Sequence, residues 1–337
     1  MGESDGCSPE GAAPEAGSRK ARANFQRFVG VDLGGGRGKN TAVARLELTY
    51  HADGRPRLAV AEAKIRQGQR GTGAPTDEAK GGATLFRDDV LLAYLGKWVD
   101  DDTVVAMNAP LTLPPCVRCT LPCPTVPKCT VPVVQWMRRW APRLVDRGRS
   151  DPSKPAVTPY TQRATELVLV GAGYQPRETL GQGTGPLAAR AAYLRRAMSP
   201  VLRLHENLIE VHPRATLVAA FGRNTADRTR HGADERVRAV RKEVLVALTE
   251  SIAFDYVWPE LVVRNTHVFN AVLCAFTAFW WAQRGLKGPA DLRRAPADPI
   301  PPGSVATTED LSAAIDDLGT QWLEDGWVWA PAPTRRR

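Results

Sequence analysis

The order of the apolar segments in the first third of the chain constrains the fold most strongly. Phe28–Leu33 is a short apolar run, and Thr41–Thr49 and Leu58–Ile65 alternate apolar with polar residues, as half-buried strands do. Leu85–Val99 repeats apolar residues at helical spacing, and Thr103–Met107 is again a short apolar run typical of a buried strand. The sequence therefore predicts three strands, a helix and a fourth strand.

The rest of the chain alternates predicted helices with predicted strands. A fifth strand is predicted at Leu208–Pro213 and a last one at Trp327–Trp329. Helices are predicted at Val133–Arg143, Tyr160–Val170, Leu187–Arg203, Asp234–Ser251, Thr266–Gln283 and Asp310–Leu318. Strands first, and then strands alternating with helices, predict an α/β fold with one mixed sheet flanked by helices.

Length and composition fit one enlarged domain with two tails. The 337 residues are 43% hydrophobic and 24% charged, which is near the average for globular proteins. We expect a disordered leader at 1–24, one domain at 25–331 with an insertion at about 113–206, and a basic tail at 332–337. No apolar run approaches the roughly 18 residues of a membrane helix, and the start lacks a secretion signal. The expected location is therefore the cytoplasm, with no membrane partner.

The net charge of +9 comes from a few arginine-rich stretches. One stretch, 138–149, includes Arg138 and Arg139, a second covers 223–242, and three arginines close the chain. Such patches are compatible with nucleic acid or a nucleotide as partner, and also with a solvated basic surface. Charge alone does not decide between these readings, and the sequence does not predict the oligomeric state.

Polar side chains stand at or near the ends of the predicted strands. Asp32 ends the first strand and is followed by glycines, which let a metal or a phosphate approach the backbone closely. Asn108 follows the fourth strand, and Glu210 lies in the fifth. The late helix adds His267 and Asn270, which share one helix face because they are three residues apart. These side chains are the candidate site.

Short motifs around these residues carry a resemblance to a known family. They read GVDLGG at 30–35, MNAPLTLP at 107–114, EVHPRAT at 210–216 and HVFNAVLCA at 267–275, joined by PYTQRATE at 159–166 and EDGWVWAP at 324–331. The chain resembles the DUF429 family of predicted nucleases over most of residues 27–331. The resemblance implies a ribonuclease H-like fold with three layers.

The resemblance also implies a site in which carboxylates hold Mg²⁺ or Mn²⁺ and place a water against a phosphodiester. The implied catalytic residues are Asp32, Asn108, Glu210, His267 and Asn270, with Asp32 and Glu210 as ligands of the catalytic metal. The family commonly has aspartate where this chain has Asn108 and Asn270. An amide oxygen still ligates a hard cation but adds no charge, so both an active nuclease and a binding protein without cleavage stay open.

The helix that begins near residue 160 is placed beside the site by the same resemblance. Tyr160, Arg163 and Glu166 would then contact the substrate, with Arg163 holding a phosphate. A buried ion pair between Arg163 and Glu166 is the alternative interpretation.

Four of the six cysteines lie within fourteen residues, in the segment CVRCTLPCPTVPKC. Cys116, Cys119, Cys123 and Cys129 have the number and proximity that a structural zinc site needs. An iron–sulfur cluster also takes four cysteines, although its common bacterial spacing is tighter. Two disulfides and unligated cysteines are the remaining possibilities. A metal here would fold the Pro-rich loop and hold the following Arg138–Arg149 stretch over the cleft.

Three functions remain open from the sequence. The first is a metal-dependent nuclease or phosphodiesterase acting on nucleic acid, and the second is a nucleic-acid-binding or interaction protein with an impaired site. The third is an actin-like ATPase, in which DLGGG would form the phosphate-binding turn, but the sequence lacks the second D-x-G turn that such a protein needs.

His205 lies in a polar stretch of the sequence, and its side chain is therefore expected at the surface.

Overall fold

The computed structural model of this chain describes residues 22–35, 40–54, 56–67, 84–145, 155, 157–229, 234–249, 252–253, 257, 259–293 and 306–331. The predicted leader up to residue 21, residue 36 of the glycine run, part of the first arginine-rich stretch and the tail at 332–337 lie outside the described residues.

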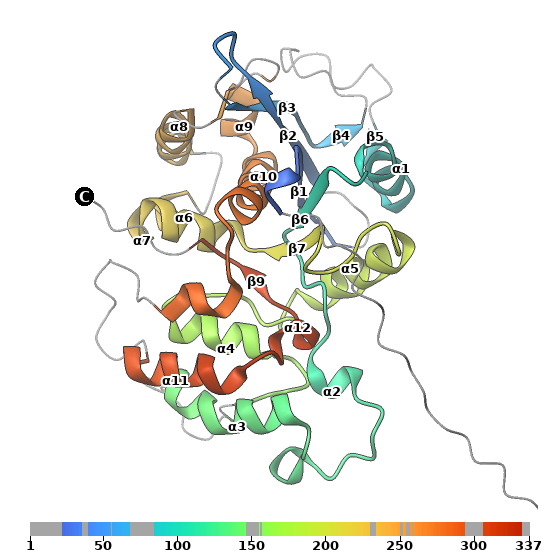
Figure 1. The fold of residues 1–337 in the computed structure, drawn as a ribbon, viewed down its shortest axis with the longest axis vertical. Coiled ribbons are helices and arrows are strands. Elements are labelled where there is room, and N and C mark those ends of the chain that lie inside the picture. The colour runs from blue at the N-terminus through green and yellow to red at the C-terminus, as the bar shows by residue number, and fades with distance from the viewer. Residues whose placement is uncertain are drawn as a thin grey trace, which may run out of the picture.

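A seven-stranded mixed sheet forms the centre of the fold, in the order β8-β3-β2-β1-β6-β7-β9 (Figure 1). The strands are β1 (Arg27–Asp32), β2 (Ala42–Tyr50), β3 (Pro56–Lys64), β6 (Thr103–Met107), β7 (Leu208–Val211), β8 (Ile252–Ala253) and β9 (Val328–Trp329). The pairs β1–β2 and β2–β3 are antiparallel, whereas β6 runs parallel to β1, β7 to β6, and β9 to β7. A separate two-stranded sheet joins β4 (Arg66–Gln67) to β5 (Thr84–Leu85). The predicted α/β class with a mixed sheet is confirmed.

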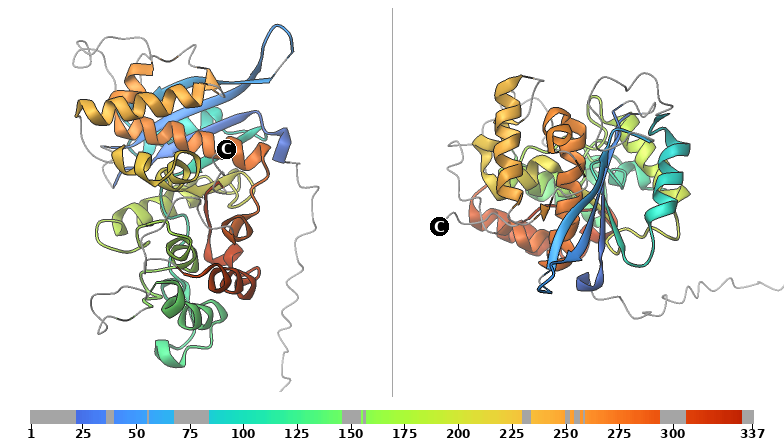
Figure 2. Two further views of the ribbon diagram at one scale, coloured as in Figure 1. Left: turned by 90° about the vertical axis from the view of Figure 1, so that its left-hand side faces the viewer. Right: turned by 90° about the horizontal axis from the view of Figure 1, so that it is seen from above.

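Helices cover both faces of the seven-stranded sheet (Figure 2). One face carries α10 (Thr266–Gln283), with α6 (Pro213–Phe221), α7 (Arg223–Arg228), α8 (Glu235–Thr249) and α9 (Pro259–Arg264) beside it. The other face carries α1 (Asp88–Trp98) and α5 (Gly185–Ala197). Because both faces are covered, the central strands β1 and β6 are almost wholly buried. This burial explains why the sequences of both strands are mostly apolar.

A group of helices lies beyond the β9 edge of the sheet, in the lower half of Figure 1. It contains α2 (Pro115–Arg118), α3 (Pro132–Leu144), α4 (Ala164–Gly171), α11 (Thr308–Leu318) and α12 (Trp322–Asp325). Short 3-10 helices form at Arg22–Asn24, which packs on α10, and at Val126–Lys128 and Gly288–Arg293. The helices α2, α3, α4 and α5 lie between β6 and β7 in the chain, within the predicted insertion. No helix of the described residues is long and apolar enough to cross a membrane.

The contact between α10 and β1 sets the position of the candidate site. A Cβ atom at Gly30 would lie 2.0 Å from the carbonyl oxygen of Ala271 and 2.4 Å from the backbone nitrogen of Ala275. Only glycine lets the helix backbone approach the strand this closely. The first turn of α10 is fixed by its N-cap, because the Asn265 side chain accepts the backbone N–H groups of His267 and Val268 at 2.9 and 3.1 Å.

Candidate functional site

Three elements meet at the carboxyl end of β1. β1 ends at Asp32, β6 ends one residue before Asn108, and α10 begins one residue before His267. Parallel pairing places Val31 opposite Met107, and the backbone N–H of Asn108 donates to the carbonyl of Val31 at 2.8 Å. The side chains that follow these two strands therefore face the first turns of α10.

The Asp32 cluster, as we call Asp32, Asn108, His267 and Asn270, is joined through one carboxylate. Asn108 Nδ2 donates to Asp32 Oδ1 at 2.5 Å, and Asn270 Nδ2 donates to Oδ2 at 3.3 Å. His267 Nδ1 lies 2.8 Å from the same Oδ2. The Asp32 side chain is only 5% exposed, whereas that of His267 is 38% exposed. The cluster thus combines a buried carboxylate with an imidazole that water reaches.

Only one carboxylate belongs to the Asp32 cluster. Asn108 and Asn270 turn their amide nitrogens toward it, so they contribute donors and no charge. Catalysis with two divalent cations relies on several carboxylate ligands. Among the described residues, no group of three or more His, Cys, Asp or Glu side chains is arranged to hold a metal ion. The donors therefore do not fit a centre for two cations.

Glu210 belongs to a different cluster, although the family resemblance predicts it beside Asp32 as a metal ligand. Its strand neighbours Ile209 and Val211 pack in the core that includes α10. Because side chains alternate along a strand, Glu210 is turned to the opposite face. There its Oε2 accepts the backbone N–H of Leu111 at 2.8 Å.

Arg163 holds Glu210 in a buried ion-pair network. Arg163 Nη2 lies 2.6 Å from Glu210 Oε1 and 2.6 Å from Glu166 Oε1, while Nη1 donates to Glu210 Oε2 at 2.8 Å. Burial alone would lower the pKa of Arg163, but the charges of Glu166 and Glu210 raise it above its usual value. Burial raises the pKa of Glu166. The buried ion pair is therefore the arrangement found, with the Arg163 side chain only 1% exposed.

A small cavity of about 70 Å³ lies between the two clusters. Asn108 lines it from the side of the Asp32 cluster, and Arg163 and Glu210 line it from the ion-pair network. Arg177 and His212 also border the cavity. The space has room for a few waters or one small group next to Asn108.

Arg190 on α5 fixes the turn that follows Asp32, and the sequence analysis did not identify it. Its Nη1 donates to the carbonyl of Gly34 and to Thr41 Oγ1, both at 2.7 Å. Its Nη2 donates to the carbonyl of Phe86 at 2.9 Å. No local pattern in the helical segment GPLAARAAYLRRA distinguishes Arg190 from the other arginines, because the role of Arg190 depends on tertiary contacts.

The other predicted substrate contacts lie outside the Asp32 cluster. Tyr160 is 51% exposed, and it precedes α4, whose N-cap residue is Arg163. Arg138 and Arg139 are exposed on α3, at the end of the molecule away from the sheet (Figure 1). Arg139 Nη1 bonds both carboxylate oxygens of Asp317, at 3.0 and 2.9 Å. The described part of the arginine-rich stretch is therefore placed against α11 and not over the Asp32 cluster.

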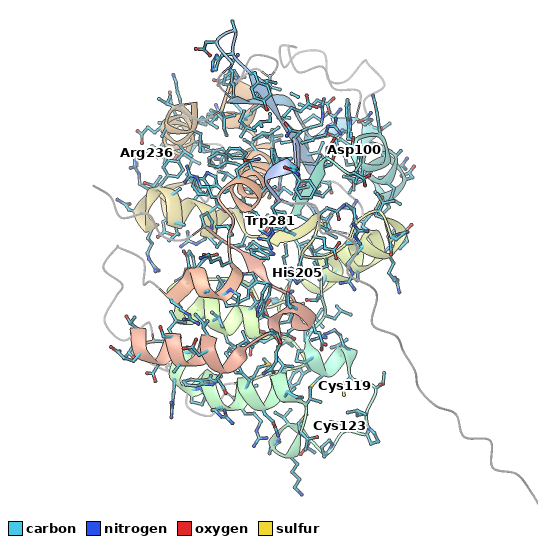
Figure 3. All side chains as sticks on the ribbon, in the orientation of Figure 1. Asp100, Cys119, Cys123, His205, Arg236 and Trp281 are labelled. Atoms are coloured by element: carbon cyan, nitrogen blue, oxygen red, sulfur yellow. The ribbon has the colours of Figure 1, made fainter. Side chains whose placement is uncertain are left out.

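The four loop cysteines are all free thiols in the described structure. Cys119 and Cys123 are exposed on the loop after α2 (Figure 3), Cys116 is half-buried, and Cys129 is buried. Burial, and then the charges of the other three thiols, raise the pKa of Cys116. The fifth described cysteine, Cys274, is wholly buried in α10, where burial raises the pKa of its thiol.

His205 is packed in an aromatic environment, so the expectation of a surface histidine is wrong. Its ring centroid lies 5.4 Å from that of Trp322 and 6.0 Å from that of Trp329. Burial lowers the pKa of His205 to about 4. The tryptophans come from the last two described elements, which the local sequence around His205 does not reveal.

A larger hollow of about 410 Å³ lies between β3 and α1. It is lined by Glu62, Lys64, Tyr94 and Trp98, among others, and none of the Asp32 cluster is among its lining residues. Tyr94 Oη donates to Glu62 Oε2 at 3.0 Å, and Lys64 Nζ donates to Glu62 Oε1 at 3.1 Å. These groups satisfy one another across the hollow.

Fold and site together define an α/β protein whose polar cluster lies at the carboxyl ends of central parallel strands. The family model described as "Protein of unknown function (DUF429)" matches residues 30–298, and the chain therefore belongs to this family. The matched span contains every member of the Asp32 cluster. No curated protein and no solved structure matches the chain.

Proposed function

We propose that this protein hydrolyses a phosphodiester bond, with Asp32 orienting His267 as the general base. The observation that carries the proposal is the 2.8 Å contact between His267 Nδ1 and Asp32 Oδ2. A carboxylate that accepts the Nδ1 proton fixes the tautomer in which Nε2 has the free lone pair. The partly exposed ring then offers this nitrogen to a water molecule.

The reaction conserves atoms and charge in two proton transfers. Nε2 of His267 removes a proton from the water as its oxygen forms a bond to phosphorus. The ester bond to the leaving oxygen breaks, and the imidazolium returns its proton to that oxygen. Asp32 stays ionised and stabilises the imidazolium, while Asn108 and Asn270 hold its two oxygens in place.

A divalent-metal centre held by several carboxylates, as the family resemblance implies, does not fit the donors of the Asp32 cluster. Asp32 supplies the only negative charge, and Arg163 neutralises Glu210 on the other face of the sheet. We therefore derive no step through Mg²⁺ or Mn²⁺. The proposal predicts cleavage carried by the imidazole, with a far weaker cation requirement than a site built from several carboxylates would show.

The family resemblance and the strand order of the sheet support the fold that we propose, and the net charge supports the partner. We propose a ribonuclease H-like fold, because the strands β3-β2-β1-β6-β7 pass from antiparallel to parallel at β1 and carry Asp32 and Asn108 at adjacent ends. We propose nucleic acid as the partner, in keeping with the net charge of +9. The cytoplasm is the proposed location, because a reducing compartment keeps the exposed thiols free.

A cleavage assay tests the proposal. The full chain is incubated with mixed DNA and RNA oligonucleotides, with EDTA, Mg²⁺ or Mn²⁺, beside Asp32→Asn and His267→Gln variants. Cleavage by the wild type that either substitution lowers by about 10²–10⁴-fold supports the proposal. Cleavage that survives both substitutions in folded protein overturns it.

Binding of nucleic acid without cleavage is the second candidate function. It is favoured by Asn108 and Asn270, two uncharged residues at positions where the family commonly has aspartate. A site with one carboxylate repels a phosphate less than a site with three. In the same assay, this candidate predicts intact oligonucleotides and salt-sensitive binding. Binding of oligonucleotide with no cleavage in any buffer would select it over hydrolysis.

A further inference from the structure

The loop that carries four cysteines has little packing of its own. Every residue from 117 to 125 is exposed, including Val117 at 47% and Leu121 at 63%. The regular structure in the loop is limited to α2 and the short 3-10 helix Val126–Lys128. Fixing a chain segment costs conformational entropy, and here almost no apolar burial offsets that cost.

The two ends of the loop are held firmly, and the cysteines begin and end the segment. The backbone N–H of Cys116 donates to the carbonyl of Pro159 at 3.0 Å. Arg118 Nη2 bonds Asp325 Oδ1 at 2.6 Å, and Asp325 Oδ2 accepts the first backbone N–H of α4 at 2.7 Å. At the other end Cys129 is buried at 8% exposure. Cys116 and Cys129 are thus the half-buried and buried members of the set, and Cys119 and Cys123 lie on the exposed span between them.

We propose that Cys116, Cys119, Cys123 and Cys129 bind one zinc ion through four thiolates. Four sulfur donors satisfy the tetrahedral preference of zinc without any further ligand. As the side chains lie, no three of them are grouped to hold a metal ion. Binding therefore requires Cys119 and Cys123 to turn inward, which their exposed positions permit. The bound ion orders the loop, because the loop lacks an apolar core that would do so.

The site is separate from the Asp32 cluster and does not depend on the proposed hydrolysis. Figure 3 shows Cys119 and Cys123 at the end of the molecule away from the sheet. The zinc joins the two anchored ends of the loop and so holds α2 against α4 through Arg118 and Asp325. Its role is structural, because four protein ligands leave no open position for a substrate.

Metal analysis of the purified full chain tests the site. The control is Cys7→Ser, at a cysteine that lies far from the loop in the sequence and outside the described residues. The wild type, Cys119→Ser, Cys123→Ser and this control are each measured for zinc, iron and acid-labile sulfide after dialysis. We expect about one zinc per chain in the wild type and in Cys7→Ser, and at least a tenfold loss of bound zinc in Cys119→Ser and Cys123→Ser. Both substituted loop positions are exposed, so the variants keep the circular dichroism spectrum of the sheet and its helices.

Replacement by cobalt supplies a second readout. Co²⁺ bound by four thiolates gives intense visible absorption with sulfur-to-metal charge transfer, which we expect in the wild type and in Cys7→Ser alone. Three results would overturn the zinc assignment: iron with acid-labile sulfide in place of zinc, two loop disulfides under reducing purification, or equal zinc in all four proteins.

Discussion

His267 Nδ1 lies 2.8 Å from Asp32 Oδ2, although 235 positions separate the two residues in the chain. The contact exists because α10 packs on β1 at Gly30 and starts at the cap formed by Asn265. An imidazole oriented by a buried carboxylate is an arrangement suited to proton transfer. The packing of one helix on one strand therefore controls the geometry of the Asp32 cluster.

Gly30→Ala is expected to disturb the cluster from a distance. The added methyl group would lie 2.0 Å from the carbonyl oxygen of Ala271, so α10 must move away from β1. Overpacking of this kind costs about 1–3 kcal/mol. Urea unfolding should show this loss, and any cleavage activity should fall with it, because α10 carries His267.

Gly96→Ala is the matched control. Gly96 is exposed in α1, and a Cβ atom there meets nothing within 4 Å. Alanine in a helix interior is favoured over glycine by roughly 0.5–1 kcal/mol. This variant should be slightly more stable than the wild type with unchanged activity. Equal losses in both variants would contradict the proposed contact between α10 and β1.

Arg163→Met should destabilise the fold strongly. It leaves the carboxylates of Glu166 and Glu210 buried without their cation, and breaking a buried pair in this way costs about 3–5 kcal/mol. Arg139→Met removes an ion pair whose arginine side chain is 61% exposed, and should cost about 1 kcal/mol or less. Denaturant midpoints of the two variants measure the contrast, and similar midpoints would contradict a buried network around Arg163.

The pKa of His205 predicts a pH dependence of stability. Burial lowers this pKa from 6.5 to about 4, so between these pH values the unfolded chain takes up a proton that the folded protein does not. Stability should therefore fall as the pH is lowered from about 6.5 to 4, by about 3 kcal/mol in total. His205→Asn should flatten this part of the stability curve, whereas His51→Asn, at an exposed position, should leave it unchanged. A curve unchanged by His205→Asn would show that other groups cause the slope.

Asn108→Asp tests the effect of the missing carboxylates. In the wild type Asn108 Nδ2 donates to Asp32 Oδ1, and an aspartate there would face Asp32 with a like charge. Without cations the variant should lose about 1–3 kcal/mol of stability, in line with the loss of a hydrogen bond to a buried group. Mg²⁺ should restore the melting temperature of the variant and leave that of the wild type nearly unchanged. An equal response of both proteins would contradict the charge argument.

The long buried elements were predictable because their patterns are local. The observed bounds of β6, Thr103–Met107, and of α10, Thr266–Gln283, coincide with the predicted ones. The helix predicted to reach Arg203 ends at Ala197, shortly before Pro200, whose ring and missing N–H disfavour a continued helix. The strands Ile252–Ala253 and Arg66–Gln67 are not predicted by the sequence, because their pairing depends on tertiary contacts.

The candidate site was predictable in part for the same reason. Ends of adjacent parallel strands meet, so the proximity of Asp32 and Asn108 follows from their places in the sequence. The separation of Glu210 from Asp32 depends on the register of β7 and on the alternation of side chains along it. The contacts of Arg190 with Gly34 and Thr41 join distant segments and leave no local signal.

Chemical rescue of His267→Gly tests whether the imidazole of His267 is the general base. The substitution removes the imidazole from a partly exposed position and leaves Asp32 in place. We expect the variant to lose oligonucleotide cleavage and to regain part of it when imidazole is added, whereas Asp32→Asn gains nothing from imidazole. A His267→Gly variant that cleaves at the wild-type rate without imidazole would show that His267 is not the general base.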